Sequence, residues 1–305
     1  GSGFTEGFSN STFNGYLAWS TDPAYKPTGV GIWCLVSFIP AVIITLMLAP
    51  LRSSSTDIHS NTKWIQNGLT VAGGNGHGNG INQLYNPRGL YVDDDQTIYV
   101  ADLSNHRIVE WKCGATSGQV VAGGNGSRNG AHQLNSHSDV IVDKERDSLI
   151  ICDNGNERVV RWPRRNGTSG ETFISNISCM DLTMDENGSL YVADNGKDEE
   201  EGVKQGIAVA SGQGSGNSLS QLSGPGGLVV DQLGAVYVAE YSNHRIMRWP
   251  KGATKGSVIA GGKGEGGQSN QLNYPIGLSF DRHGNLYVAD QWNNRVQKFN
   301  IDSNS

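Results

Sequence analysis

The sequence of 305 residues is poor in charge, because only 17% of its residues are Asp, Glu, Lys or Arg. The 29 acidic residues outnumber the 23 basic ones, and the net charge of −6 gives no overall basic character for binding nucleic acid. The chain also lacks the G-x-S-x-G and H-E-x-x-H motifs, which mark serine hydrolases and zinc proteases. These absences argue against several common classes of enzyme and against a typical nucleic-acid-binding domain.

Cysteine is scarce as well, with four residues at positions 34, 113, 152 and 179. No two of them have the C-x-x-C spacing of a zinc ribbon or a thioredoxin-type site. A bridge between Cys152 and Cys179 remains open. Free, buried cysteines are the favoured interpretation, since reduced cysteine is among the most buried residue types.

Glycine, by contrast, is abundant, with 42 residues that recur at fixed offsets in a repeated pattern. The clearest copy, GLSFDRHGNLYVADQWNNRVQKF (277–299), predicts three short strands separated by two turns. Five copies start at Leu90, Val140, Leu182, Leu228 and Leu278, at intervals of 50, 42, 46 and 50 residues. Short strands with this period are typical of the blades of a β-propeller, with a solenoid as the usual alternative.

The pattern Y-V-A-D-x-x-N-H-R-I-x-x-W/F in these copies resembles the NHL repeat, the blade unit of a propeller family. The resemblance implies an all-β, NHL-type β-propeller over residues 67–300, and propellers of this kind commonly have six blades. Five blades are readable here, and the third copy departs from the pattern after Asp194. A strained five-bladed ring and a gap near residues 198–206 both remain open.

The order of the strands predicts how the ring closes. Glycine-rich outer strands at 68–80, 118–130 and 256–267 each lead into the next inner set, and weaker copies lie at 171–175 and 206–214. The first outer strand therefore precedes every inner set, and the last inner set has no outer strand after it. We expect residues 69–72 to pair with residues 295–299, which removes two open sheet edges.

The N-terminal part differs in composition from the repeats. Residues 1–29 are assigned no fold, 52–66 are expected to be a polar linker, and 301–305 a tail. Residues 30–51 contain no charge and are long enough to cross a membrane, so we expect a transmembrane helix or signal anchor. The flanking basic residues weakly favour a cytoplasmic propeller. Four glycosylation sequons favour an extracellular or lumenal one, which is the location expected here. The sequons are at Asn125, Asn166, Asn176 and Asn187.

Four of the five copies carry an acidic residue, an asparagine and an arginine at the turn between their second and third strands. The carboxylate ends one strand and the guanidinium begins the next, so the two are expected to pair, with bidentate geometry available. Repetition in every intact copy predicts a structural role, since a single active site needs only one such group. The residues are Asp102, Asn105, Arg107, Asp153, Asn156, Arg158, Glu240, Asn243, Arg245, Asp290, Asn293 and Arg295.

A ligand-binding face is expected where the glycine loops and these turns meet. In an up-and-down blade, both kinds of loop fall on the same side of the ring, where binding sites are formed by loops on a rigid scaffold. The candidate residues are His77, Leu103, Arg128, His132, His137, Tyr241, Lys263, Glu265 and Trp292. The G-x-G-x-x-G matches in the same loops are not expected to bind a nucleotide, because a strand and not a helix follows them.

The predicted function is a membrane-anchored, non-catalytic interaction module that presents this face to a protein or glycan partner, with no cofactor. The alternative is a metal-dependent lactonase or lyase, since some relatives of this fold use Ca²⁺ or Zn²⁺ near the central axis. Only Asp139 and Asp181 offer strong ligands there, and capping of the strand ends is the favoured role for both. RNA binding is the second alternative, suggested only by the three arginines around Trp162, and no nucleic-acid partner is expected.

Overall fold

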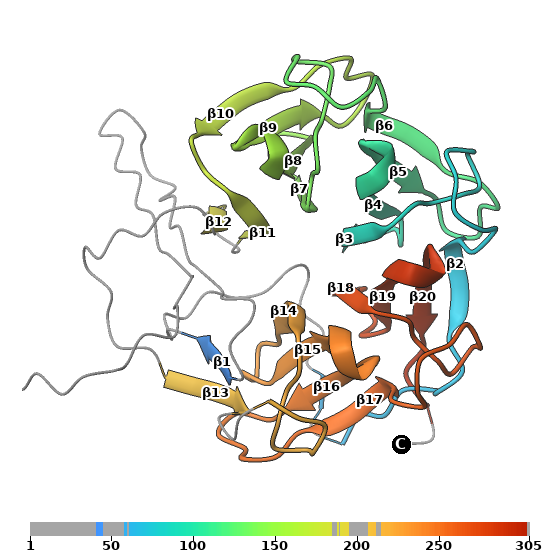
Figure 1. The fold of residues 1–305 in the computed structure, drawn as a ribbon, viewed down its shortest axis with the longest axis vertical. Helices are drawn as coiled ribbons and strands as arrows, with labels where there is room; N and C mark the ends of the chain where they lie inside the picture. Colours follow the sequence, from blue (N-terminus) through green and yellow to red (C-terminus); the bar gives the residue numbers. More distant parts are fainter. Residues whose placement is uncertain are drawn as a thin grey trace, which may run out of the picture.

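The computed structural model describes residues 41–44, 58–59, 61–184, 188, 190–194, 207–211 and 215–303. Its repeated unit is an antiparallel sheet, or blade, and the blades stand side by side around a central axis (Figure 1). Four blades have four strands each in the order expected for a propeller. The first strand of every blade lies at the centre and the last at the rim (Figure 1).

The blades are numbered I to V along the chain. Blade I contains β3 (Pro87–Val92), β4 (Ile98–Asp102), β5 (Arg107–Trp111) and β6 (Gln119–Gly123). Blade II contains β7 (Asp139–Asp143), β8 (Ser148–Asp153), β9 (Arg158–Pro163) and β10 (Glu171–Ser175). Blade III is described as β11 (Cys179–Met184) and β12 (Leu190–Asp194). Blade IV contains β14 (Pro225–Val230), β15 (Val236–Glu240), β16 (Arg245–Trp249) and β17 (Ser257–Gly261).

Blade V confirms the predicted ring closure. It contains β18 (Pro275–Phe280), β19 (Leu286–Asp290) and β20 (Arg295–Phe299), and its fourth strand is β2 (Leu69–Gly73) from the start of the repeat region. In the antiparallel register of β2 and β20, Leu69 pairs with Lys298 and Ala72 with Val296. The backbone N–H and C=O groups of both strands are therefore hydrogen-bonded along edges that a linear array would leave open.

The turns follow directly from the sequence. Between β18 and β19, Asp281 Oδ1 accepts hydrogen bonds from the backbone N–H groups of His283 and Asn285. Gly284 completes this turn at φ +76°, a conformation that glycine adopts without strain. Between the second and third strands, a single 3₁₀ turn is followed by one left-handed residue, such as His244 at φ 52°. The 3₁₀ turns are η1 (Leu103–Asn105), η2 (Asn154–Asn156), η3 (Tyr241–Asn243) and η4 (Gln291–Asn293).

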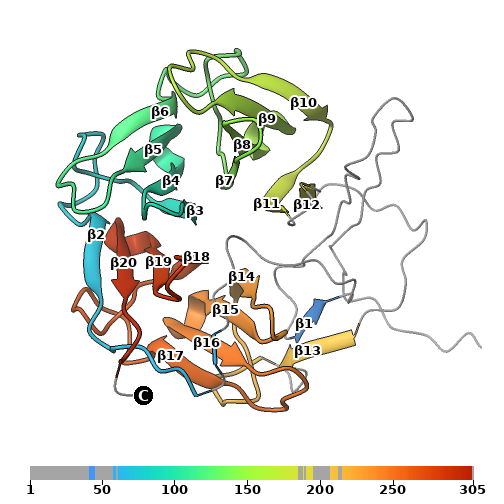
Figure 2. The same ribbon diagram turned by 180° about the vertical axis from the view of Figure 1, so that it is seen from behind.

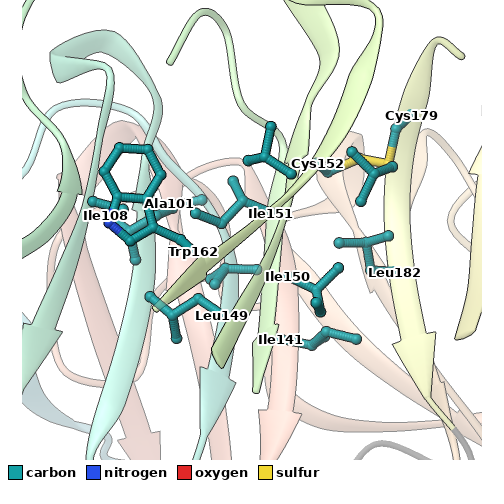
Figure 3. Close-up of a cluster of buried hydrophobic side chains, with 14 of the residues drawn as sticks. Ala101, Ile108, Ile141, Leu149, Ile150, Ile151, Cys152, Trp162, Cys179 and Leu182 are labelled. Carbon is teal, nitrogen blue, oxygen red and sulfur yellow. A yellow bond between two sulfur atoms is a disulfide. The ribbon is translucent and has the colours of Figure 1, made fainter. Parts of the chain in front are cut away.

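The hydrophobic core lies between the faces of neighbouring blades. In β8, all six residues are buried, because both faces of this strand are covered. Figure 3 shows the cluster in which Ile150 and Ile151 of β8 lie among side chains of blades I, II and III. Aromatic residues near the ends of the third strands fill the outer core, including Trp111, Trp249 and Phe299, which are almost completely buried.

Within the part of the chain that the structure describes, blades III and IV do not pack against each other as the other neighbouring blades do. The first strands pack against one another in the series β14, β18, β3, β7 and β11, and the two ends of this series do not meet (Figure 1, Figure 2). Among the described residues, therefore, the five sets of strands do not form a closed five-bladed ring. Strand β13 (Ile207–Ser211), which was expected to be the outer strand of blade III, pairs instead with β1 (Ala41–Ile44) beside the junction of blades III and IV.

Strand β1 lies within the segment predicted to be a transmembrane helix. Of the predicted transmembrane helix at 30–51, the structure describes only Ala41–Ile44, and these four residues form a strand. Three of them are β-branched, which favours a strand, and β13 supplies the hydrogen-bonding partner. The other residues of the predicted helix lie outside the described part of the chain, as do residues 1–29. Among the residues that the structure describes, no helix is long and apolar enough to cross a membrane.

The segment expected to be a polar linker contributes to the core. Ile58 and Trp64 are each only 3% exposed, and the Trp64 indole N–H donates to the Gly284 carbonyl at 3.0 Å. The Trp64 ring also meets Tyr237 edge-on, with 6.1 Å between centroids. On the other side, Trp64 forms a β-bridge with Ile301, a residue of the expected tail. Both ends of the repeat region are therefore packed against blades IV and V.

A disulfide joins blades II and III, which corrects the expectation of free cysteines. Cys152 in β8 and Cys179 at the start of β11 are bridged, with 5.5 Å between their Cα atoms (Figure 3). Both residues are fully buried at the blade interface, where their side chains face each other across the two sheets. The remaining described cysteine, Cys113, is free and exposed.

Candidate functional site

The acidic residue, asparagine and arginine of each intact repeat form one buried network. In blade I, Asp102 Oδ2 accepts from Arg107 Nε at 2.7 Å and from Asn105 Nδ2 at 2.8 Å, while Oδ1 accepts from the Tyr85 backbone N–H. The terminal nitrogens of Arg107 donate to carbonyls of the preceding glycine loop, at Asn79, Gly80 and Gln83. The pair is therefore a single contact and not the bidentate geometry considered above. Burial raises the pKa of Asp102, against the opposing effect of these hydrogen bonds.

The other three networks repeat this arrangement. Asp153 with Arg158, and Asp290 with Arg295, each have a 2.7 Å contact, and Glu240 pairs in the same way with Arg245. Their asparagines, Asn156, Asn243 and Asn293, donate both to the acidic residue and to a glycine-loop carbonyl. The network thus holds the glycine loop against the turn between the second and third strands of the same blade. The acidic residue, asparagine and arginine are engaged in these structural hydrogen bonds.

The structure separates the predicted binding residues into four groups, of which Tyr241 and Trp292 form the last. His77, Arg128, His132, Lys263 and Glu265 are exposed on three glycine loops, those that follow β2, β6 and β17. Leu103 is half-buried in η1. His137, however, is completely buried with its Nε2 2.9 Å from the Arg107 carbonyl oxygen, so it does not belong to the face. Burial lowers the pKa of His137 to about 3, which keeps the ring neutral.

Tyr241 and Trp292 belong to an aromatic cluster that also includes Tyr274 and His244. Tyr274 lies between the other two rings, with centroids 4.4 Å from Tyr241 and 4.4 Å from Trp292 and with planes tilted by 47° and 43°. The His244 ring meets Tyr274 nearly perpendicularly at 4.7 Å. We call Tyr241, Tyr274 and Trp292 the aromatic strip.

The strip is positioned by the junction between blades IV and V. Tyr241 begins η3 of blade IV, and Trp292 lies in η4 of blade V. Tyr274 immediately precedes β18, and its backbone N–H donates to His244 Nδ1 at 3.2 Å across the junction. Tyr274 has a left-handed backbone with φ 53°, as do the equivalent residues Asn86 and Ser136. Trp292 is 54% exposed, which is unusual for the largest apolar side chain.

The strip departs from the repeat at all three of its positions. The residue equivalent to Trp292 is a serine in blades I and IV, at Ser104 and Ser242. The residues equivalent to Tyr274 are Asn86, Ser136 and Gly224, and those equivalent to Tyr241 are Leu103, Asn154 and Gln291. The residues of the repeated network, which the fold of each blade requires, recur in every intact blade. Three aromatic residues that do not recur, but meet at one junction, therefore indicate a local requirement other than folding.

A second set of polar residues lies at the centre of the ring, on the innermost strands. Burial lowers the pKa of Arg88 of β3, and the electrostatic influence of Asp181 of β11, Asp139 of β7 and Tyr241 of the strip opposes this effect. Asp139 Oδ2 and Asp181 Oδ1 both accept from the Leu182 backbone N–H at 2.9 Å, so both carboxylates bond to the backbone within β11 and not at its end.

The two aspartates were the weak candidates for a metal site. Within the described part of the chain, no three His, Cys, Asp or Glu side chains are grouped so that they could hold a metal ion. The positive charge of Arg88 interacts electrostatically with both aspartates, which opposes the binding of a cation by the same carboxylates. The donor set therefore fits a metal poorly.

The arginines around Trp162 are engaged elsewhere. Arg164 pairs with Asp93 and donates to the Tyr99 hydroxyl at 2.7 Å, joining blades II and I. Arg161 lies over the Phe173 ring, with its guanidinium carbon 4.8 Å from the ring centroid. Trp162 itself is buried. These contacts give no support to the RNA-binding interpretation.

The predicted glycosylation sites also differ from one another. Asn125 donates its side-chain amide to the Gly123 and His132 carbonyls, and Asn75 makes the matching contacts in the preceding glycine loop. The asparagine of the Asn125 sequon therefore has a structural role in the repeated glycine loop, which explains why it is present. Asn166 and Asn176 are exposed at left-handed turns, and Asn187 lies outside the described residues.

The comparisons with known proteins agree with this architecture. The model of the NHL repeat matches residues 84–111, 222–248 and 272–299, which belong to blades I, IV and V. The chain is an NHL-repeat β-propeller protein. No curated protein matches the sequence.

Several solved structures are similar to the chain at low sequence identity. A gluconolactonase from Xanthomonas campestris has 12% identity and a TM-score of 0.48, over 88% of this chain and 100% of the other. An auxiliary nutrient binding protein from Bacteroides thetaiotaomicron has 13% identity and a TM-score of 0.48, over 89% and 78%. A PQQ-bound aldose sugar dehydrogenase from Streptomyces coelicolor has 12% identity and a TM-score of 0.48, over 81% and 100%. Likeness at this level carries no argument about activity.

Sequence reasoning missed two residues of these sites, Tyr274 and Arg88. Both stand directly beside a proline at the start of a first strand, where the repeat alone suggests a turn. An alignment of the repeat copies could have found both residues. Tyr274 is the one aromatic residue among the residues aligned with it, and Arg88 is the one charged residue among the residues aligned with it.

Proposed function

We propose that this chain is a non-catalytic interaction module and that the aromatic strip is the centre of its binding surface. The observation behind this proposal is the convergence of three non-repeated aromatic residues, one of them largely exposed, at the junction of blades IV and V. Tyr and Trp are the residues most enriched at the energetic centres of binding surfaces, because they offer a large rigid area together with a polar edge.

We further propose that the propeller functions in an extracellular or lumenal compartment. The disulfide between Cys152 and Cys179 supports this location, since buried disulfides form and persist in oxidising compartments and are rare in the cytosol. The exposed sequons at Asn166 and Asn176 are compatible with it. Mass spectrometry of protein from its native host, with and without glycosidase treatment, tests the proposal; a reduced Cys152 together with unmodified sequons would contradict it.

The binding role is tested with the full chain and a variant in which the strip is replaced by residues from other blades. Tyr241→Leu, Tyr274→Asn and Trp292→Ser introduce the residues found at Leu103, Asn86 and Ser242. Both proteins are immobilised and exposed to an extracellular-matrix extract, and the retained protein and carbohydrate are quantified. We expect material that the native chain retains and the variant does not. Equal retention by both proteins would refute the role of the strip.

The same preparation separates the module from the metal-dependent alternative. We expect no stoichiometric Ca²⁺ or Zn²⁺ by elemental analysis and an unchanged melting temperature after treatment with a chelator. One equivalent of either metal, released together with a fall in melting temperature, would favour a lactonase-type or lyase-type enzyme using Asp139 and Asp181.

A further inference from the structure

The hydrogen bond between Tyr274 and His244 can form in only one charge state of the histidine. The Tyr274 backbone N–H donates to His244 Nδ1 at 3.2 Å, so this ring nitrogen is the acceptor and carries no proton. A neutral imidazole has one such acceptor, whereas a protonated imidazolium has two donors and no acceptor. Protonation of His244 would therefore remove the bond and set two donors against each other at the junction of blades IV and V.

The junction between blades V and I has a bond of the same kind that does not depend on charge. There Asn294 occupies the position of His244, and its Oδ1 accepts at 3.0 Å from the backbone N–H of Asn86, the residue equivalent to Tyr274. Blade I also has a histidine at this position, but among the described residues Nδ1 of His106 is buried without a hydrogen-bond partner. The position thus joins neighbouring blades, and blade IV places a titratable side chain there.

We propose that His244 is a pH-sensitive latch for the aromatic strip: neutral His244 holds Tyr274 in place, and its protonation releases Tyr274 and weakens the binding of a partner at Trp292. The inference rests on the proposed function and names how that site is regulated. An extracellular or lumenal propeller would meet such a change, since compartments of the endocytic route are acidic and histidine changes charge in that pH range.

The strip depends on Tyr274 for its shape. The Tyr274 ring is enclosed between Tyr241 and Trp292, with 4.4 Å between centroids on each side, so it positions its neighbours while the exposed Trp292 meets the partner. Its backbone has φ 53°, a conformation that is unfavourable for a bulky residue. Contacts that hold Tyr274 are therefore needed, and the His244 ring supplies two of them, the hydrogen bond and a nearly perpendicular ring contact at 4.7 Å.

The charged and titratable groups around His244 come from both blades. Each blade contributes one ion pair, and within each pair the two charges largely compensate. Lys263 directly follows Gly262, whose N–H donates to the His244 carbonyl at 2.9 Å, and the positive charge of Lys263 opposes protonation of the ring. The full set consists of the Glu240–Arg245 pair of blade IV, the Asp290–Arg295 pair of blade V, Lys263, Tyr241 and Tyr274.

The first measurement needs no partner. The full chain is labelled with ¹⁵N, and the Tyr274 amide and His244 ring signals are followed by NMR from about pH 7.5 to about pH 5, where histidine changes charge. We expect the Tyr274 amide signal to shift together with the protonation of His244. His244→Asn introduces the residue found at Asn294, which accepts the equivalent bond and has the same φ of 52°. This variant is expected to fold, to keep the bond and to lose the shift.

The second measurement uses the extracellular-matrix extract. Material that the native chain retains at about pH 7.5, and that the strip variant does not retain, is washed at about pH 5. We expect the native chain to release about fivefold more of it than His244→Asn does, which is the effect expected from the loss of one buried hydrogen bond. The matched control is His106→Asn, which removes the equivalent histidine of blade I, away from the strip, and should behave like the native chain.

A Tyr274 amide that does not shift with pH, or that shifts equally in His244→Asn, would overturn the inference, and so would equal release from the two proteins. Asp290, whose pKa is raised by burial, is present in both proteins and cannot account for a difference between them. If the native chain retains no strip-dependent material at neutral pH, the proposed function fails, and the amide titration still decides whether His244 holds Tyr274 in a pH-dependent way.

Discussion

Removal of the Cys152–Cys179 disulfide tests how blade III is held in the ring. The double variant Cys152→Ala, Cys179→Ala breaks the link between β8 and β11. Alanine is already present at the position equivalent to Cys152 in blades I, IV and V, as Ala101, Ala239 and Ala289. The packing cost of this substitution is therefore small, and the change in stability reports the loss of the link.

The size of the effect follows from the length of the loop that the disulfide closes. The sequence separation is 27 residues, and the chain-entropy relation gives about 3.5 kcal/mol at 25 °C for a loop of that length. Blade III is described as two strands, and within the described residues it does not pack against blade IV as the other neighbouring blades pack. We therefore expect the loss to be concentrated there, so that β11 and β12 open before the other blades.

The assay is urea unfolding followed by circular dichroism, combined with hydrogen exchange of the β11 and β12 amides. We expect a lower free energy of unfolding and faster exchange in these two strands, with β18 and β19 little changed. Cys113→Ser, which alters the free and exposed cysteine, is the control and should match the native chain. A loss below about 1 kcal/mol with unchanged exchange would refute the reasoning.

Three further predictions concern the core. His137 is buried with its pKa lowered to about 3, so as the pH falls the histidine of the unfolded chain is protonated before that of the folded chain. The free energy of unfolding is therefore expected to decrease as the pH falls below about 6.5. Urea unfolding at pH 7 and pH 5 should show a loss of about 2 kcal/mol that is absent in His137→Gln. Trp64→Ala should cost about 3–5 kcal/mol in thermal unfolding, against a much smaller cost for Trp64→Phe, and equal costs would contradict a packing role. Asp290→Ala should lower the free energy of unfolding by about 3–5 kcal/mol in the same assay, because it leaves the buried Arg295 guanidinium without its carboxylate partner. Asp290→Glu should cost far less, since Glu240 pairs with Arg245 in the same way in blade IV. Equal losses in the two variants would contradict the ion-pair explanation.

Most of the architecture could be predicted because repetition multiplies weak local signals. The placement of one outer strand before every inner set was sufficient to predict that β2 would pair with β20. The turn at His283, Gly284 and Asn285 was predicted from residue type alone and is present. These features depend on backbone chemistry that each blade repeats, so an error in one copy is corrected by the others.

The failures occur where one copy departs from the rest. His137 was placed on the binding face as a loop residue, yet it aligns with Pro87 and Pro275 at the starts of first strands and is buried there. Cys152 occupies an alanine position, and its pairing with Cys179 depends on contact between two blades, which periodicity does not reveal. The contact of Tyr274 with Trp292 likewise forms only when blades IV and V meet.

The pairing of β2 with β20 has a consequence for synthesis of the chain. Leu69 of β2 pairs with Lys298 of β20, so the hydrogen bonds between these strands cannot form until nearly the whole repeat region has left the ribosome. A product that stops before Arg295 would present an unprotected strand to other nascent chains, and such exposed edges promote aggregation. Quality control of this protein is thus expected to act on its final strand.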